Sequence, residues 1–272
     1  MKATTISAPG ARCLDDDRPV LMLLPGMVCN RRVWRHQARH LADRCEPCVA
    51  DYGDARHMGD MARAVLAQAP ERFLLAGHSM GARVAMEVQR LAPERVAGLC
   101  FAGTEYGACP AGEAGRQETE GRDALLAVAR KQGMPAMARR WLPALIPAAR
   151  LNDKALVEEL LTMIAEHSPD DLEAHIAAGA SRSDSSAVLQ SISVPTLLLA
   201  GAEDQLRPPA AHREMAAMIP DARLVEIPGA GHMLTMENPE AVNAALDQWV
   251  AACWHFCSRG ATPTPVRPVN VD

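Results

Sequence analysis

The feature that most constrains the fold of this chain is the segment Gly77-His78-Ser79-Met80-Gly81 together with its flanks. The apolar run Phe73–Ala76 precedes the segment and is typical of a buried strand. Small, charged and apolar residues follow the segment at helical spacing until Pro93. A serine between two glycines at a strand-to-helix junction is the pattern of a sharp turn that lifts the serine hydroxyl above a sheet. The sequence therefore predicts a strand–turn–helix unit with Ser79 at the turn.

The rest of the chain alternates short apolar runs with amphipathic segments, which is typical of an α/β protein with a mostly parallel sheet. Strands are expected at Val20–Leu24, Cys48–Tyr52, Phe73–Ala76, Val96–Ala102, Thr196–Ala200 and Arg223–Ile227. Helices are expected near Val33–Ala42, Met58–Gln68, Met80–Leu91, Pro209–Met218 and Pro239–Val250. Residues 3–14 have a weak pattern that permits one or two edge strands.

The alternation stops after Thr104. From about Arg116 to Ser191 no strand pattern occurs, and Gly133 and several prolines, Pro143 among them, interrupt the helical periods. We therefore expect a core of residues 1–104 and 192–252, interrupted by an all-helical insertion of residues 105–191. The proline-rich end of the chain predicts a disordered tail of residues 253–272.

Two polar residues follow late strands and complete a chemical pattern with Ser79. Asp204 lies just past Thr196–Ala200, and His232 follows Arg223–Ile227 in the loop Gly229-Ala230-Gly231-His232. The carboxyl ends of strands are where catalytic groups collect in an open α/β sheet. A serine hydroxyl is a weak nucleophile until a base takes its proton and an acid orients that base.

Alternatives exist for both partners of the serine. Glu203 competes with Asp204 for the role of the acid. The chain carries nine histidines, but only His232 lies in a glycine-rich loop after a late strand. The side chain of His78 is expected to point away from its neighbour Ser79, into the packing of helix or sheet.

These motifs together resemble the α/β-hydrolase fold family, and in particular its lidded serine esterases and lactonases. The resemblance runs from about Val20 to about Ala252. It rests on Leu23-Leu24-Pro25-Gly26-Met27, on Gly77-His78-Ser79-Met80-Gly81-Ala82, on Gly201-Ala202-Glu203-Asp204 with Pro208, and on Gly229-Ala230-Gly231-His232-Met233 with Glu237-Asn238-Pro239.

The resemblance implies a fold and a site. The fold is a mostly parallel central sheet with helices on both faces and an all-helical lid. The site is a catalytic triad of Ser79, Asp204 and His232, with an oxyanion hole made by the backbone N–H groups of Met27 and Met80. Two such donors stabilise the developing alkoxide by several kcal/mol.

The chain departs from the family's pattern in three places. Pro25-Gly26 stands where the family usually has His-Gly, so a side chain that commonly braces this loop is missing. Asp51-Tyr52-Gly53-Asp54-Ala55 replaces a usual Gly-x-Gly-x-Ser. Met233 follows the histidine where relatives that cleave carbon–carbon bonds often carry tryptophan, which weighs against that reaction.

The expected lid carries an apolar stripe that can meet a substrate. Met134, Met137 and Trp141, together with Met233 beside the histidine, are candidates for an adaptable apolar binding pocket. The alternative is that the stripe only packs on the core. Arg139 or Arg140 can anchor a substrate carboxylate, or can simply be solvated.

The expected activity is two-step acyl transfer from a carboxylic ester or lactone to water. Its partners are a small ester molecule and water, and the mechanism requires no metal and no organic cofactor. The same triad also supports perhydrolase or haloperoxidase activity, thioester cleavage and acyl transfer. A receptor that binds its ligand without turnover is the alternative outside enzymes.

Charge, hydropathy and cysteine content exclude other classes of protein. A net charge of −5 without a basic tract argues against nucleic-acid binding. No apolar run reaches the length of a membrane span, and no apolar signal region follows Met1, so we expect a soluble, cytoplasmic protein. The eight cysteines are expected to be reduced, mostly buried thiols, since Cys45-Glu46-Pro47-Cys48 has no second pair that would complete a zinc site.

Overall fold

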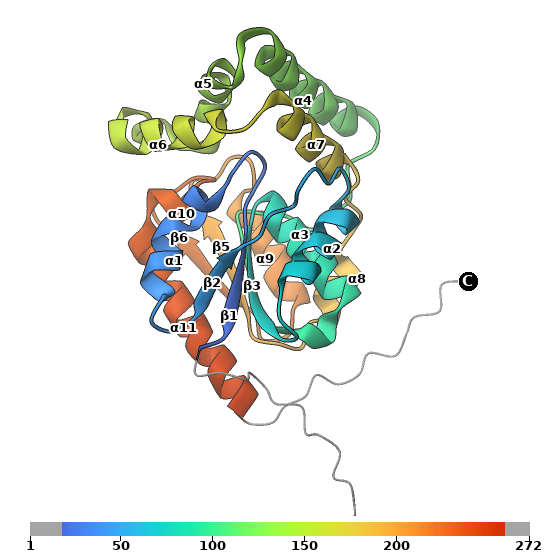
Figure 1. The fold of residues 1–272 in the computed structure, drawn as a ribbon, viewed down its shortest axis with the longest axis vertical. Coiled ribbons are helices and arrows are strands. Elements are labelled where there is room, and N and C mark those ends of the chain that lie inside the picture. Colours follow the sequence, from blue (N-terminus) through green and yellow to red (C-terminus); the bar gives the residue numbers. More distant parts are fainter. Residues whose placement is uncertain (1–17, 259–272) are drawn as a thin grey trace, which may run out of the picture.

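A computed structural model of the protein describes residues 18–258, so the edge strands expected at residues 3–14 lie outside the described residues. The six described strands form one parallel sheet in the order β2-β1-β3-β4-β5-β6 (Figure 1). Their bounds are β1 Val20–Leu24, β2 Glu46–Val49, β3 Phe73–His78, β4 Val96–Ala102, β5 Thr196–Gly201 and β6 Arg223–Ile227. The predicted mostly parallel α/β sheet is confirmed.

The inner strands β3, β4 and β5 are mostly apolar, because helices cover both faces of the sheet. Every residue of β3, β4 and β5 is buried, whereas the edge strands β2 and β6 are partly exposed. The second strand lies earlier than predicted and ends at Val49. Beyond Ala50 the chain turns away, because the carboxylate of Asp51 accepts the N–H of Gly53 in a local turn.

Two helices pack on one face of the sheet and three on the other. The first face carries α1 (Arg35–Leu41) and α11 (Pro239–Ser258), and the second carries α2 (Met58–Gln68), α3 (Met80–Leu91) and α9 (Pro209–Met218) (Figure 1). A 3₁₀ turn, Arg31–Trp34, precedes α1 and occupies the start of the helix expected at Val33. Further short turns are Pro93–Arg95, Ala148–Asn152 and the helix α10, Leu234–Glu237.

The last helix is longer than expected, and the tail predicted from residue 253 is wrong for residues 253–258. Trp249, Val250, Cys253 and Cys257 recur at helical spacing and are all buried. A Cβ on Gly98 of β4 would overlap the sulfur of Cys253, so α11 packs directly on the sheet at this point. Residues 259–272 of the predicted tail lie outside the described residues.

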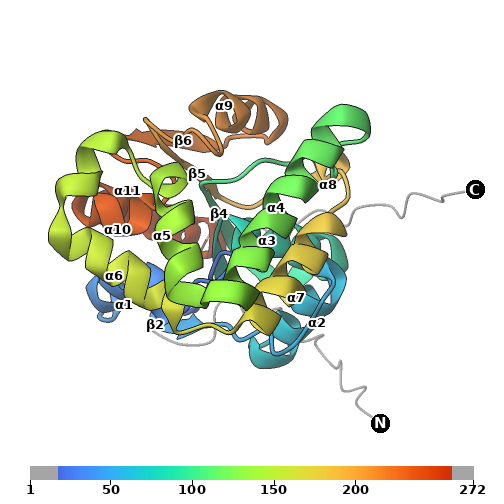
Figure 2. The same cartoon turned by 90° about the horizontal axis from the view of Figure 1, so that it is seen from above.

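The segment between β4 and β5 is all helical, as predicted, and contains α4 (Gly112–Gln132), α5 (Met134–Leu145), α6 (Lys154–Ala165), α7 (Pro169–Ala180) and α8 (Ser186–Ser191). Helices α4 to α7 lie over the carboxyl ends of the strands (Figures 1 and 2), whereas α8 packs against α3 and α9 of the core. Gly133, at φ +85°, separates α4 from α5 as predicted. Pro143 lies inside α5 and does not end it, because this residue is on the exposed face, where water can satisfy the carbonyl left without its donor.

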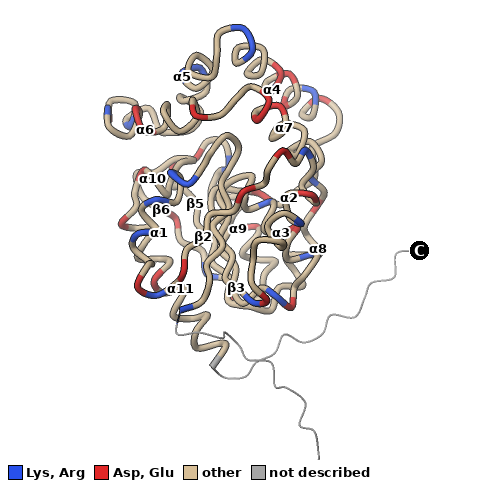
Figure 3. Tube along the Cα trace, viewed as in Figure 1, with Lys and Arg blue, Asp and Glu red and all other residues tan. Residues whose placement is uncertain are grey.

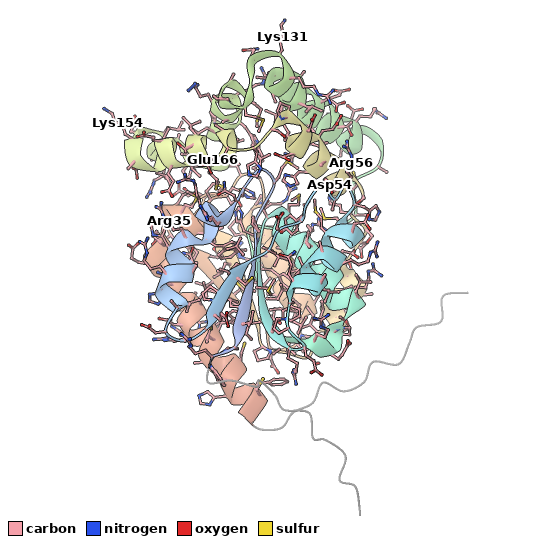
Figure 4. The ribbon with its side chains drawn as sticks, viewed as in Figure 1. Arg35, Asp54, Arg56, Lys131, Lys154 and Glu166 are labelled. Carbon is pink, nitrogen blue, oxygen red and sulfur yellow. The ribbon has the colours of Figure 1, made fainter. Side chains whose placement is uncertain are left out.

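The two connections to the insert lie side by side. The N–H of Cys109 donates to the carbonyl of Arg182 at 3.2 Å, and the N–H of Ser185 donates to the carbonyl of Tyr106 at 3.0 Å. Farther along, three ion pairs join the insert to the core: Arg32–Glu166, Arg35–Glu159 at 2.8 Å and Arg56–Glu173 at 2.9 Å. Figure 4 labels Arg35, Arg56 and Glu166 at this junction, while Lys131 and Lys154 point outward from the insert.

Charged residues of both signs are distributed over the core and the insert (Figure 3). None of the helices within residues 18–258 combines the length and the apolar character needed to cross a bilayer. The placement of the insert over the strand ends defines where a site can be enclosed.

Candidate active site

The strand order reverses next to β1, and this reversal creates the crevice in which α/β proteins bind their ligands. The chain passes from β1 outward to β2 and then returns to β3 on the other side of β1. The loops that leave β1 and β3 therefore diverge at the carboxyl edge of the sheet. Pro25-Gly26-Met27 occupies the first loop, and Ser79 occupies the second.

Ser79 lies in a strained turn between β3 and α3. Its φ of +55° and ψ of −116° are rare for a residue with a side chain. A Cβ on Gly77 would overlap the backbone of Gly81 and Ala82, and one on Gly81 would overlap the backbone of Leu24 and Pro25. The two glycines are thus required because the helix, the strand and the neighbouring loop meet at this turn.

His232 and Asp204 lie in line with the serine. The Nε2 atom of His232 is 2.9 Å from the Oγ atom of Ser79, and its Nδ1 atom is 2.9 Å from Oδ2 of Asp204. With the Nδ1–H donating to the carboxylate, Nε2 is free to accept the serine proton. Glu203, the alternative acid, is exposed to solvent.

The side chain of Asp204 is fully buried, and its carboxyl group remains ionised. Burial alone would raise its pKa, but the hydrogen bond from His232 and the N–H groups of Arg207 and Leu206 lower the pKa below its ordinary value. Those two N–H groups donate to Oδ1 at 2.9 and 2.8 Å, which leaves Oδ2 for the imidazole. The carboxylate is therefore fixed in position and in charge.

The loop after β1 is braced by residues other than the missing family histidine. The hydroxyl of Tyr52 donates to the carbonyl of Pro25 at 2.9 Å, and the indole N–H of Trp34 donates to the carbonyl of Leu24 at 3.0 Å. Val28 has a φ of +45°, and its N–H donates to Nδ1 of His175 on α7 at 3.1 Å. A Cβ on Gly26 would come within 3.2 Å of the Cβ of Ser79, so this loop lies against the serine turn.

Met80 is the first residue of α3, where a helix leaves its N–H groups without intrahelical acceptors. Met80 and Met27 thus flank Ser79 from the helix and from the loop after β1. The oxyanion hole expected from their two N–H groups stays a prediction.

Two buried residues support His232, and the sequence did not reveal the role of either. The Nε2 atom of the buried His78 lies 2.8 Å from the carbonyl oxygen of His232, and the two ring centroids are 5.3 Å apart, so His78 packs against the loop that carries His232. Glu237 accepts the N–H of Gly231 at 2.9 Å, and burial raises the pKa of this carboxyl to about 7. The sequence offered only two hints of these roles. His78 is adjacent to Ser79, and Glu237 belongs to the motif Glu237-Asn238-Pro239.

Comparison with known proteins supports the same architecture. The model of the alpha/beta hydrolase family matches residues 21–245. The chain belongs to this family.

The names of related proteins state different activities. The "Putative carbamate hydrolase RutD" of Klebsiella pneumoniae is 28% identical over 249 residues, which cover 86% of this chain and 92% of the relative. The "Putative non-heme bromoperoxidase BpoC" of Mycobacterium tuberculosis is 30% identical over 188 residues, which cover 68% and 69% of the two chains. A solved structure of a thermophilic esterase from Thermogutta terrifontis has 28% identity and a TM-score of 0.74, covering 88% of this chain and 92% of that one.

In this family member a cavity of about 1050 Å³, including the part open to solvent, lies between the serine turn and the insert. The expected residues Met27, Met80, Trp141 and Met233 line it. The expected residues Met134 and Met137 do not line it. They are buried on α5, which packs between α4 and α6, so the first half of the apolar stripe belongs to the interior of the insert.

The arginines expected to hold a carboxylate are not in the cavity either. Arg139 and Arg140 are exposed on α5. Four other arginines line the cavity instead: Arg83, Arg122, Arg182 and Arg207. No sequence pattern predicted this grouping, since the four arginines come from four separate segments.

Within residues 18–258 no group of three or more histidine, cysteine or acidic side chains is placed to hold a metal ion. The seven cysteines in this range are not joined in disulfides, and five of them are buried, while Cys13 lies outside the range. Cys29 is next to the loop after β1, but burial raises its pKa to about 12. A neutral thiol at that position is a poor nucleophile.

Proposed function

We propose that this protein is a serine hydrolase that cleaves a carboxylic ester or lactone with a small to medium, largely apolar body. The observation that carries the proposal is the continuous hydrogen-bonded line from Ser79 through His232 to Asp204, with the serine at a strained turn inside the cavity. Such an arrangement is typical of nucleophilic acyl transfer.

In the proposed first step, His232 removes the proton of Ser79 as Oγ attacks the carbonyl carbon. The carbonyl π electrons move to oxygen, and the N–H groups of Met27 and Met80 stabilise the resulting oxyanion. Collapse of the tetrahedral intermediate breaks the bond to the alcohol oxygen, to which His232 returns the proton. Asp204 keeps the imidazole in the required tautomer and stabilises its positive charge.

In the second step, His232 removes a proton from water, and the oxygen of that water attacks the acyl-enzyme. The Oγ atom of Ser79 leaves and regains a proton from His232, so the acid is released and the starting state restored. The apolar lining, which includes Trp141, Leu145 and Met233, would hold the body of the substrate and limit competing water.

The test is turnover of p-nitrophenyl esters of increasing acyl length by the wild type, Ser79→Ala and Ser191→Ala. Ser191 is an exposed serine of α8 and serves as the matched control. We expect rapid hydrolysis by the wild type and Ser191→Ala, and a loss of kcat by a factor of roughly 10⁴ or more in Ser79→Ala. Equal turnover by Ser79→Ala would refute the proposal.

Carbamate hydrolysis is the second candidate, because the relative from Klebsiella pneumoniae is named a putative carbamate hydrolase and is matched over 92% of its length. Oγ of Ser79 attacks the carbonyl carbon in the same way and expels the same alcohol, but the intermediate is a carbamoyl-enzyme in place of an acyl-enzyme, and water releases the carbamic acid. Parallel assays with a p-nitrophenyl carbamate decide between the two classes. An acylation burst without turnover on any of these substrates would instead support a receptor.

A further inference from the structure

One wall of the cavity is built from four arginines that no step of the proposed reaction uses. Arg83 lies on α3, one helical turn after Ser79, and Arg122 lies on α4 of the insert. Arg182 follows α7, and Arg207 lies in the loop after β5. Both the core and the insert therefore contribute guanidinium groups to the same enclosed space.

The carboxylates of this wall do not balance its arginines. Glu105 is shared, at 3.3 Å from Arg83 and 3.2 Å from Arg207, and Glu118 pairs with Arg182 at 2.6 Å. These ion pairs set two carboxylates against three guanidinium groups, and with Arg122 the wall has an excess of two positive charges. The carboxylate of Asp184 also interacts with Arg83 but is exposed to solvent.

Arg122 makes its contacts with uncharged groups. It donates to the sulfur of Met27 at 3.5 Å, and its guanidinium lies over the ring of Trp141 at 5.6 Å. Burial lowers the pKa of Arg122, and the charges of Arg207 and Arg182 lower it further, while the carboxylate of Glu118 opposes the shift. Glu118 forms its ion pair with Arg182, so the direct contacts of Arg122, close to the loop after β1, are with Met27 and Trp141.

Arg83 is the most deeply buried of the four. Its side chain is 6% exposed; Nη2 pairs with Glu105 at 3.3 Å, whereas Nη1 is buried without a hydrogen-bond partner. Burial lowers its pKa to about 10, which leaves it charged at neutral pH. A buried cation with unpaired donors costs folding free energy unless an anion supplies the missing acceptors.

We propose that this wall is an anion subsite, and that the substrate is an ester or lactone with a carboxylate a few bonds from its reacting carbonyl. The inference rests on the proposed function and names the substrate class for it. A carboxylate fits the planar fork of a guanidinium group and would complete the hydrogen bonds of Arg83 or Arg122. The apolar part of the same cavity, with Leu145, Met163 and Met233, would hold the methylene chain between the two groups.

The experiment compares the monomethyl and dimethyl esters of succinic, glutaric and adipic acids, which differ only in one free carboxylate. We expect the wild type to prefer the monoester by about tenfold or more in kcat/KM for at least one chain length, as a charged hydrogen bond provides. Arg122→Met should reduce that preference to within about threefold of unity. Arg122 is the first choice because its removal leaves no carboxylate without a partner, whereas Arg182→Met would strand Glu118.

Arg139→Met is the matched control, since Arg139 is exposed on α5 and lies outside the cavity. It should leave the monoester preference unchanged. If Arg122→Met fails to fold, Arg207→Gln carries the same expectation, because its side chain is 25% exposed. An equal loss of preference in Arg139→Met would show a general charge effect and overturn the subsite.

Calorimetric titration of monomethyl adipate into Ser79→Ala, with and without Arg122→Met, separates binding from turnover. Hydrolysis of monoester and diester at equal kcat/KM for every chain length would overturn the subsite and leave the proposed function standing. Absence of hydrolysis, with monoester binding that Arg122→Met abolishes, would overturn the proposed function and support the subsite.

Discussion

Replacing His175 by phenylalanine should slow the proposed hydrolysis although His175 lies on the insert and is not one of the three aligned residues. The ring of His175 is 8% exposed, and its Nδ1 accepts the N–H of the fully buried Val28. That acceptor holds Val28 at a φ of +45°, which costs a β-branched residue ~1–3 kcal/mol. Val28 directly follows Met27, a proposed oxyanion donor.

The magnitude follows from these contacts. Phenylalanine leaves a buried N–H without an acceptor, which costs ~1–3 kcal/mol in addition to the strain already stored at Val28. The loop relaxes in response, and the N–H of Met27 moves away from the oxyanion. Loss of one such donor lowers kcat by ~100-fold or more, with a smaller effect on KM.

His175→Asn is the matched control, because the Oδ1 atom of asparagine can take the place of Nδ1 as the acceptor and does not titrate. The assay is steady-state hydrolysis of a p-nitrophenyl ester by the wild type and both variants. A kcat for His175→Phe within about threefold of the wild-type value would refute the reasoning.

The buried imidazole of His175 also predicts that the stability of the wild type depends on pH. Burial lowers the pKa of His175 to about 4; the charge of His167 lowers it and Asp171 opposes the shift. As pH falls from about 6.5 to about 4, the unfolded chain takes up a proton that the folded chain does not, so the wild type loses up to roughly 3 kcal/mol. Urea unfolding across that window should show a smaller loss for His175→Asn than for the wild type.

Two further predictions concern packing and charge near the serine. Gly81→Ala should prevent stable folding or cost several kcal/mol of stability, because its Cβ would overlap the backbone of Leu24 and Pro25. Gly121→Ala in α4 is the control: its Cβ would meet no neighbouring atom, and the change should stabilise the protein by ~0.5–1 kcal/mol. Thermal unfolding measures both effects. Burial raises the pKa of Glu237 to about 7. The wild type should therefore lose stability as pH rises from about 4.5 to 7, while Glu237→Gln should not. Urea unfolding at several pH values measures this, and the same pH dependence of unfolding free energy in both proteins would contradict it.

The sequence predicted the parts of the site that depend on local patterns. Ser79, Asp204 and His232 were predicted to lie together because each follows an apolar strand in a recognisable turn, and the three are in hydrogen-bond contact. The braces of the loop after β1 were not found, because the contact of Val28 with His175 spans 147 positions and depends on how the insert docks. No local pattern encodes that docking.

The errors have a similar origin. A helical stripe shows that Met134 and Met137 are buried but not which neighbour buries them, and the neighbour is the rest of the insert. Cys253 and Cys257 looked like the start of a tail, because helical spacing of two cysteines is a weak signal beside the prolines that follow.

The adjacent connections at Tyr106–Ser185 and Cys109–Arg182 give the enzyme a modular construction. Because the chain leaves the core and returns to it at one place, residues 107–184 can be exchanged for another helical segment without rerouting the sheet. Such an exchange would carry Arg122 and Arg182 away but leave Arg83 and Arg207 in the core. An exchange of this kind would therefore replace half of the proposed anion subsite and keep the other half.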